Sequence, residues 1–133
     1  MTSDRCRDAA PPGLLAGIDL FNRREFFACH EVLEEIWRAE RDPVRLLYQG
    51  TLQIGVGFHH LGRGNWVGAV RQLEKGISGV AHFVPGCMGI DTDRLTREAR
   101  ACLDLLRTLG ADGLERFDWS LVPTIAVDRR AQG

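Results

Sequence analysis

The chain has 133 residues, of which 44% are hydrophobic and 26% are charged, and its formal net charge at pH 7 is −1. This length and composition predict one domain that buries a sufficient core without disulfides or metals. Because the charges nearly balance, the composition favours neither a nucleic-acid partner nor binding to an acidic membrane surface.

Cysteine usage and hydropathy bear on the compartment. Four cysteines lie far apart without a C-x-x-C pair or a secretory signal, a pattern typical of reduced thiols in a cytoplasmic protein: Cys6, Cys29, Cys87 and Cys102. Cys29 and Cys102 stand in apolar helical patterns and are expected in the core. No uninterrupted apolar run reaches the ~20 residues of a membrane span, so we expect a soluble protein with no membrane contact.

The N-terminal part combines a polar segment with a short helix. Residues 1–12 lack periodicity and contain Pro11-Pro12, so they are predicted to be a flexible tail, with residues 13–133 forming one helical domain. Asn22 is expected to cap the next helix. The short helix between these points carries four apolar residues on one face: Leu14, Leu15, Ile18 and Phe21.

A second helix is predicted over residues 24–40. Its apolar face is centred on five residues: Phe26, Cys29, Leu33, Ile36 and Trp37. His30 lies on the shoulder of this face, and Glu34 follows one turn later, so their side chains can touch. Glu31 and Glu35 point outward.

The stretch 42–65 is predicted to contain the central helix of a bundle, which ends at Gly62-Arg63-Gly64. Asp42-Pro43 is a typical helix start, and apolar residues then occupy almost every side, as in a buried helix. Gln49, Gln53 and His60 fall within one narrow stripe, while His59 points away from it and is expected at the surface. Unpaired burial of a polar group costs about 1–3 kcal/mol, so this stripe predicts a buried polar site with partners.

Two more helices complete the predicted fold. Asn65 is expected to cap a helix over residues 66–84, whose small-residue face predicts close packing against Gly50 and Gly57: Gly68, Ala69, Gly76 and Gly79. A fifth helix runs from Asp91 to Gly110, and the aromatic C-terminal segment is expected to lie extended across the bundle. The fold class is therefore all-α, a compact single-domain bundle of about five helices with a buried central helix.

Three motifs together resemble the uncharacterised family known as domain of unknown function 309. They are Phe21-x4-Phe26-Phe27-x2-His30-Glu31-x-Leu33-Glu34-x2-Trp37, then Gln49-Gly50-x2-Gln53 with His60, then Gly64-Asn65-x2-Gly68-Ala69. The resemblance implies a multi-helical fold of small soluble bacterial and archaeal proteins with no established activity. The family positions carried over are His30, Glu31, Glu34, Trp37, Gln53, His60 and Asn65. Thr51-Leu52 departs from the aliphatic pair that usually follows the glycine in this family, and we expect this change to affect packing and not chemistry.

The candidate site lies between helices 24–40 and 42–62. We take three residues as candidate catalytic groups (His30, Glu34, His60) and five as candidate ligand-binding groups (Glu31, Trp37, Gln49, Gln53, Asn65). Two imidazoles and a carboxylate can hold a divalent metal with an open water position for hydrolysis. Without metal, His30 and Glu34 can act as an acid/base pair.

Two interpretations stay open. In the first, the polar cluster is a pocket for small-molecule binding or hydrolytic chemistry. In the second, the domain is non-catalytic, structural or interacting, and a closed hydrogen-bond network merely fixes helix packing. The apolar faces also allow a homodimer, through the flank bearing Trp66 and Val67 or through the C-terminal segment.

Overall fold

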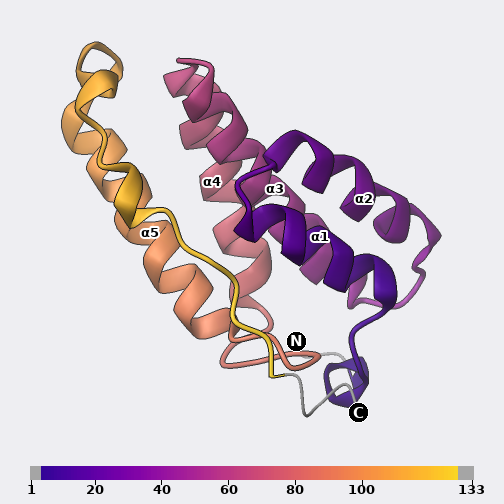
Figure 1. The fold of residues 1–133 in the computed structure, drawn as a ribbon. Helices are drawn as coiled ribbons and strands as arrows, with labels where there is room; N and C mark the ends of the chain where they lie inside the picture. The colour runs from indigo at the N-terminus through magenta and orange to yellow at the C-terminus, as the bar shows by residue number, and fades with distance from the viewer. Residues whose placement is uncertain (1–3, 129–133) are drawn as a thin grey trace.

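The computed structural model describes residues 4–128 of the chain. Within them lie five α-helices: α1 Pro12–Asn22, α2 Phe26–Ala39, α3 Arg45–Gly62, α4 Trp66–Ala81 and α5 Thr92–Leu109 (Figure 1). Short 3₁₀ helices stand at Asp4–Arg7, Ala111–Arg116 and Trp119–Leu121. In this described part, β-pairing is limited to isolated bridges from Ile90 to Cys87 and to Val127. The predicted all-α bundle is confirmed.

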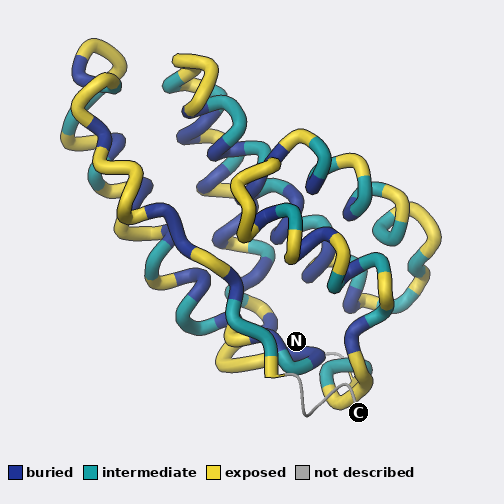
Figure 2. Tube along the Cα trace, viewed as in Figure 1, coloured by how far each residue is buried: buried dark blue, intermediate teal, exposed yellow. Residues whose placement is uncertain are grey.

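Helix α3 is the central element. It packs against α2 on one side and α4 on another, while α1 covers α2 and α5 covers α4. Four large α3 side chains are almost completely buried: Leu47, Tyr48, Ile54 and Phe58. In Figure 2, the buried positions of neighbouring helices face one another. The burial of α3 is incomplete, however, because Leu46 remains 42% exposed.

Glycines bring α3 and α4 into close contact. A Cβ atom added at Gly76 would lie 2.6 Å from the carbonyl oxygen of Gly50 and 2.7 Å from the amide nitrogen of Ile54. Real Cβ atoms do not approach backbone atoms so closely, so only glycine fits at this position. The predicted packing of the small-residue face of α4 against Gly50 is confirmed.

Several predicted helix ends differ from the observed ones. Helix α3 begins at Arg45, and Asp42 stabilises the preceding turn, its Oδ1 accepting a hydrogen bond from the Val44 amide at 2.9 Å. Helix α4 ends at Ala81 instead of residue 84. The predicted cap at Asn65 is confirmed, because its side chain accepts a hydrogen bond from the first turn of α4. Asp91 caps α5 in the same way.

The C-terminal segment crosses the bundle in extended form, as expected (Figure 1). The Asn22 side chain anchors it, accepting from the Ile125 amide at 2.7 Å and donating to the Ile125 carbonyl at 3.1 Å. Asn22 therefore does not cap α2, whose N-cap is Glu25. The surface predicted for a dimer loses Trp66, because this side chain packs against the core. Its Nε1 donates to the Leu106 carbonyl at 2.7 Å.

The N-terminal segment is attached to the bundle. Cys6 and Cys87 form a disulfide, and the Met88 amide donates to the Cys6 carbonyl at 2.7 Å. The segment expected to be a flexible tail is thus joined to the bundle at Cys6. The expectation of reduced thiols is wrong for Cys6 and Cys87. The sequence could not reveal the pairing because 81 positions separate the two cysteines. The predicted tail residues 1–3 lie outside the described residues.

The other two cysteines match the prediction. Cys29 and Cys102 are free and buried, and burial raises the pKa of each thiol to about 12. Such thiols remain protonated and unreactive at neutral pH.

Among the described residues, no helix has the length and apolar character required to cross a membrane.

Candidate functional site

The predicted pair of His30 and Glu34 is present on α2. His30 Nε2 lies 2.9 Å from Glu34 Oε2, and Arg38 Nη2 lies 2.6 Å from the other carboxylate oxygen. Glu34 thus bridges two basic groups one turn away on either side. The side chains of His30 and Glu34 are 31% and 28% exposed, so solvent weakens their attraction to a modest value.

The predicted polar site is only partly buried. His30, Glu34, Gln49, Gln53 and His60 are all half-buried. The reason is that α2 and α4 cover only part of α3. One stripe of α3 stays partly exposed, comprising Leu46, Gln49, Gln53, Val56 and His60. The polar residues on this stripe keep access to water and need no closed network.

An aromatic cluster joins α2 and α3 next to the His30–Glu34 pair. The Phe27 ring is 58% exposed and lies 6.1 Å from the His30 ring and 5.5 Å from the His59 ring. The His60 ring follows 6.2 Å beyond His59. Three imidazoles therefore gather along one ridge, and His59, which we expected to point away, is its middle member.

The remaining candidates have separate roles. His60 Nδ1 lies 3.3 Å from Asn65 Nδ2, while Asn65 Oδ1 caps α4. The Trp37 ring lies under the Arg45 guanidinium, 5.1 Å from its carbon. Glu31 is exposed. Within residues 4–128, no hydrogen bond connects Gln49 or Gln53 to Glu34 or to the three histidines of this region, His30, His59 and His60.

The structure does not assemble the predicted metal ligands. In the region from residue 4 to residue 128, no three His, Cys, Asp or Glu side chains are placed to hold one ion. His30 and Glu34 are adjacent, but His60 turns toward Asn65. A divalent metal therefore has no three-ligand set in this part of the chain.

A groove of about 280 Å³ lies between the N-terminal end of α2 and the C-terminal end of α3. Seven residues line it: Arg24, Phe26, Phe58, His59, Gly62, Arg63 and Trp119. Three of the lining residues are aromatic and three are basic. Arg24 comes from the turn before α2, where it adopts a positive φ of 64°, and its Nη2 donates to the Trp119 carbonyl at 3.0 Å.

No carboxylate lines this groove. The nearest acidic residues in sequence already have partners, since Glu25 pairs with Arg23 at 3.8 Å and Asp118 accepts hydrogen bonds from Ser120. Neither Arg24 nor Arg63 forms an ion pair within residues 4–128. The groove is therefore positive. Sequence reasoning missed it because Trp119 is 95 positions from Arg24.

The pKa of His59 is lowered, first because burial disfavours the imidazolium and then because Arg63, His60 and His30 carry like charge. An unfolded histidine titrates near its ordinary pKa of about 6.5. Between that value and the lower folded-state pKa, the unfolded chain binds more protons, so stability falls as the pH decreases through this window.

We therefore expect the free energy of unfolding of wild type to decrease between pH 7.5 and pH 5, and His59→Gln to show a smaller decrease. Urea unfolding at several pH values measures this difference. His82→Gln is the control, because His82 is exposed at the end of α4 and away from the ridge. Equal pH dependence in wild type and His59→Gln would contradict the prediction.

The comparisons with known proteins bear on the same region. Residues 14–72 match the family described as domain of unknown function (DUF309). The resemblance found in the sequence is thus confirmed over α1, α2, α3 and the first part of α4. The matched residues include the ridge, Arg24 and Arg63, whereas Trp119 and Cys87 lie beyond the DUF309 match.

One curated relative resembles the chain more widely. "Uncharacterized protein YpuF" of Bacillus subtilis (strain 168) is 29% identical over 97 residues, which cover 71% of this chain and 56% of the relative. The chain therefore corresponds to little more than half of that protein's length. No solved structure matches. Neither DUF309 nor this relative supplies a reaction.

Proposed function

We propose that the protein binds a small anionic molecule with an aromatic part in the groove between α2 and α3. The observation that carries the proposal is the groove lining: Arg24 and Arg63 supply two cationic groups, Phe26, Phe58 and Trp119 are aromatic, and no lining residue is acidic. Uncompensated cationic groups in a concave site attract anions. Arginine also binds carboxylates and phosphates through paired hydrogen bonds.

The α2 helix adds to this attraction. It has 14 residues, and its N-cap Glu25 makes no side-chain capping hydrogen bond. Free amide groups and the helix dipole at such an end favour negative charge. The opposing carbonyls at the end of α3 are already engaged, since the His60 carbonyl accepts from the Asn65 amide at 2.9 Å.

The size and walls of the groove favour a small ligand. A volume of about 280 Å³ is close to the lower limit of about 300 Å³ for small-molecule sites. Trp119, which is 37% exposed, stands at its edge. An aromatic ring can pack against such a side chain while its anionic group contacts the arginines.

A hydrolytic role is the second candidate function. It is favoured by the contact of 2.9 Å between His30 and Glu34, because a carboxylate can orient an imidazole as a general base. The ridge places His30 next to Phe27, and Phe27 next to His59 of the groove. A bound anion would thus lie on the same face as this pair. The purely structural alternative has less support, because half-exposed groups do not form a closed network.

The cytoplasmic location and the homodimer remain proposals. For the dimer, Val67 at 50% exposure is the part of the predicted flank that is still available on α4.

Thermal unfolding with three probes tests the proposed binding. Phenyl phosphate should raise the Tm more than inorganic phosphate, and benzyl alcohol should have little effect, because the groove offers both charge and aromatic side chains. At a probe concentration 100 times the Kd, the stabilisation is about 2.7 kcal/mol. Arg63→Gln should weaken phenyl phosphate binding about tenfold, as expected for loss of one charge-assisted hydrogen bond.

The matched control is Arg97→Gln. Arg97 is on α5, is 63% exposed and pairs with Asp93, so its replacement should not change the affinity. Equal binding of phenyl phosphate by wild type and Arg63→Gln, or equal weakening by Arg97→Gln, would contradict the assignment of the groove.

A further inference from the structure

We propose that the disulfide between Cys6 and Cys87 is a reducible latch, at which a dithiol reductant exchanges and thereby releases residues 4–9 from the bundle. The disulfide joins the Asp4–Arg7 turn to the loop between α4 and α5. This inference is independent of the anion groove, which lies at the α2–α3 junction.

The disulfide is accessible from the surface. It borders a groove of about 580 Å³, together with residues of the α4–α5 loop and of the C-terminal segment. Cys6 is half-buried, whereas Cys87 is only 2% exposed. An incoming thiolate therefore reaches Cys6 Sγ more easily than Cys87 Sγ. Cys29 and Cys102 do not line this groove.

The exchange follows ordinary thiol–disulfide chemistry. A thiolate of the dithiol attacks Cys6 Sγ, a mixed disulfide forms, and the bond to Cys87 breaks. Cys87 Sγ leaves with the electron pair and takes up a proton. The second thiol of the reductant then closes its own disulfide and releases Cys6 as a thiol. Two electrons and two protons pass from the dithiol to the protein.

Apart from the disulfide, polar contacts attach the segment: the Met88 amide donates to the Cys6 carbonyl at 2.7 Å, and Arg5 pairs with Glu40. None of the four residues of the Asp4–Arg7 turn is buried, so the hydrophobic effect contributes little to its attachment. Arg5 Nη1 pairs with Glu40 Oε2 at 3.2 Å, with the two side chains 36% and 18% exposed. Solvent access on the Arg5 side limits the strength of this pair. Opening the disulfide should therefore free the segment up to Ala10, which is the next buried residue.

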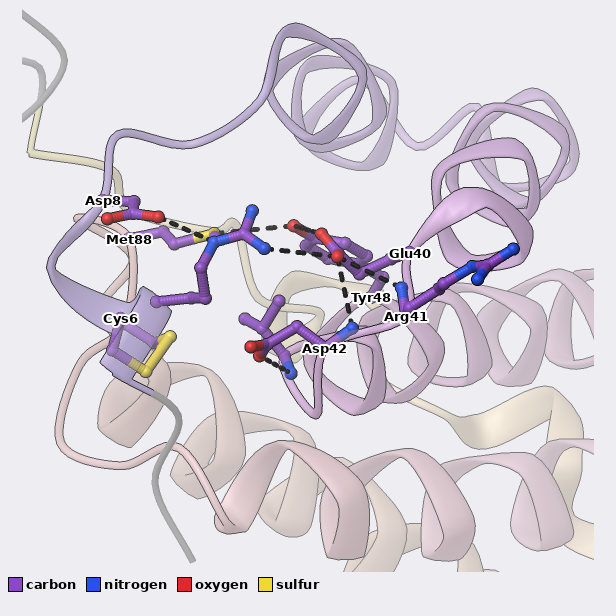
Figure 3. Close-up of polar contacts among 10 residues, drawn as sticks. Cys6, Asp8, Glu40, Arg41, Asp42, Tyr48 and Met88 are labelled. Atoms are coloured by element: carbon purple, nitrogen blue, oxygen red, sulfur yellow. Dashed lines mark hydrogen bonds and ion pairs between the residues drawn. A yellow bond between two sulfur atoms is a disulfide. The ribbon is translucent and has the colours of Figure 1, made fainter.

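The segment covers a specific polar group of the bundle. In Figure 3, the Glu40 carboxylate lies next to Tyr48, with the Cys6 disulfide nearby. Tyr48 donates to Glu40 Oε1 at 3.4 Å. Arg5 also forms part of the wall of a cavity of about 250 Å³ that contains Glu40 and Tyr48. Release of the segment would expose this carboxylate to the solvent. The proposed cytoplasmic location agrees with a reducible disulfide, because disulfides in the cytoplasm are usually transient and redox-sensing.

The test is native-state reduction of the wild-type chain with dithiothreitol, followed by alkylation and mass spectrometry. We expect Cys6 and Cys87 to be alkylated at least tenfold faster than Cys29 and Cys102. Tryptic cleavage after Arg5 and Arg7 should accelerate at least tenfold on reduction, while circular dichroism shows the helices retained. Alkylation of all four cysteines at one rate, or an unchanged cleavage rate, would overturn the latch.

Two variants separate the disulfide from the ion pair. Cys87→Ser should be cleaved at the fast rate with or without dithiothreitol. Oxidised Arg5→Gln should stay resistant at Arg7, because the disulfide and not the ion pair retains the segment. Fast cleavage at Arg7 in oxidised Arg5→Gln would overturn the proposal. If Cys87→Ser fails to fold, the alkylation rates of wild type still decide the question.

Discussion

Gly76→Ala is expected to destabilise the protein by about 3 kcal/mol, although alanine forms helices better than glycine by about 1 kcal/mol. The new methyl group would meet the Gly50 carbonyl oxygen at 2.6 Å and the Ile54 amide nitrogen at 2.7 Å. Both are backbone atoms of α3 and cannot rotate away, so the two helices must separate. Urea unfolding followed by circular dichroism measures the loss.

Gly79→Ala is the matched control one turn later on α4. A Cβ atom there would approach no atom closer than 3.4 Å, the nearest being Gly50 Cα, which is ordinary contact. The higher helix propensity of alanine relative to glycine should then increase the stability of the protein, by up to about 1 kcal/mol. If both variants were stabilised alike, the close approach of α3 and α4 at Gly76 would be refuted.

Phe21→Ala should cost about 4 kcal/mol, within the range for removal of a buried aromatic ring. Phe21 is completely buried at the junction of three helices. Its ring makes edge contacts with Phe26 of α2 at 5.3 Å and with Phe58 of α3 at 6.2 Å. Its loss leaves a cavity that neither neighbour can fill. The free energy of unfolding from urea titration gives the value.

Phe27→Ala provides the comparison at an exposed position. Because the Phe27 ring is 58% exposed, its removal should change stability by about 0.5 kcal/mol, as for other surface substitutions. A loss at Phe27 comparable to that at Phe21 would show that the ridge is covered in solution, for example by a second copy of the chain.

The sequence by itself determined the helices and much of their packing. Asn65 was recognised as a cap because side-chain capping is a local interaction. The glycine face of α4 predicted the contact with Gly50 because small residues at helical spacing permit close backbone approach. The His30–Glu34 contact also followed from spacing, since residues four apart share a helix face.

Burial of the polar stripe was decided only by the tertiary structure. Periodicity shows which residues share a side of α3, but not which sides neighbouring helices cover. Leu46, Gln53 and His60 looked central because apolar residues surround them in sequence, yet their stripe remains partly exposed. Where a bundle places its few helices is a property of the whole assembly, so a single helix pattern does not specify it.

Long-range contacts were likewise beyond the sequence. The Cys6–Cys87 bond and the placement of Trp119 beside Arg24 join segments 81 and 95 positions apart. Helical spacing relates residues only three or four positions apart, so no local pattern identifies such partners. They are fixed by how the chain ends pack: the first turn against the α4–α5 loop, and the C-terminal segment, held by Asn22, across the helices.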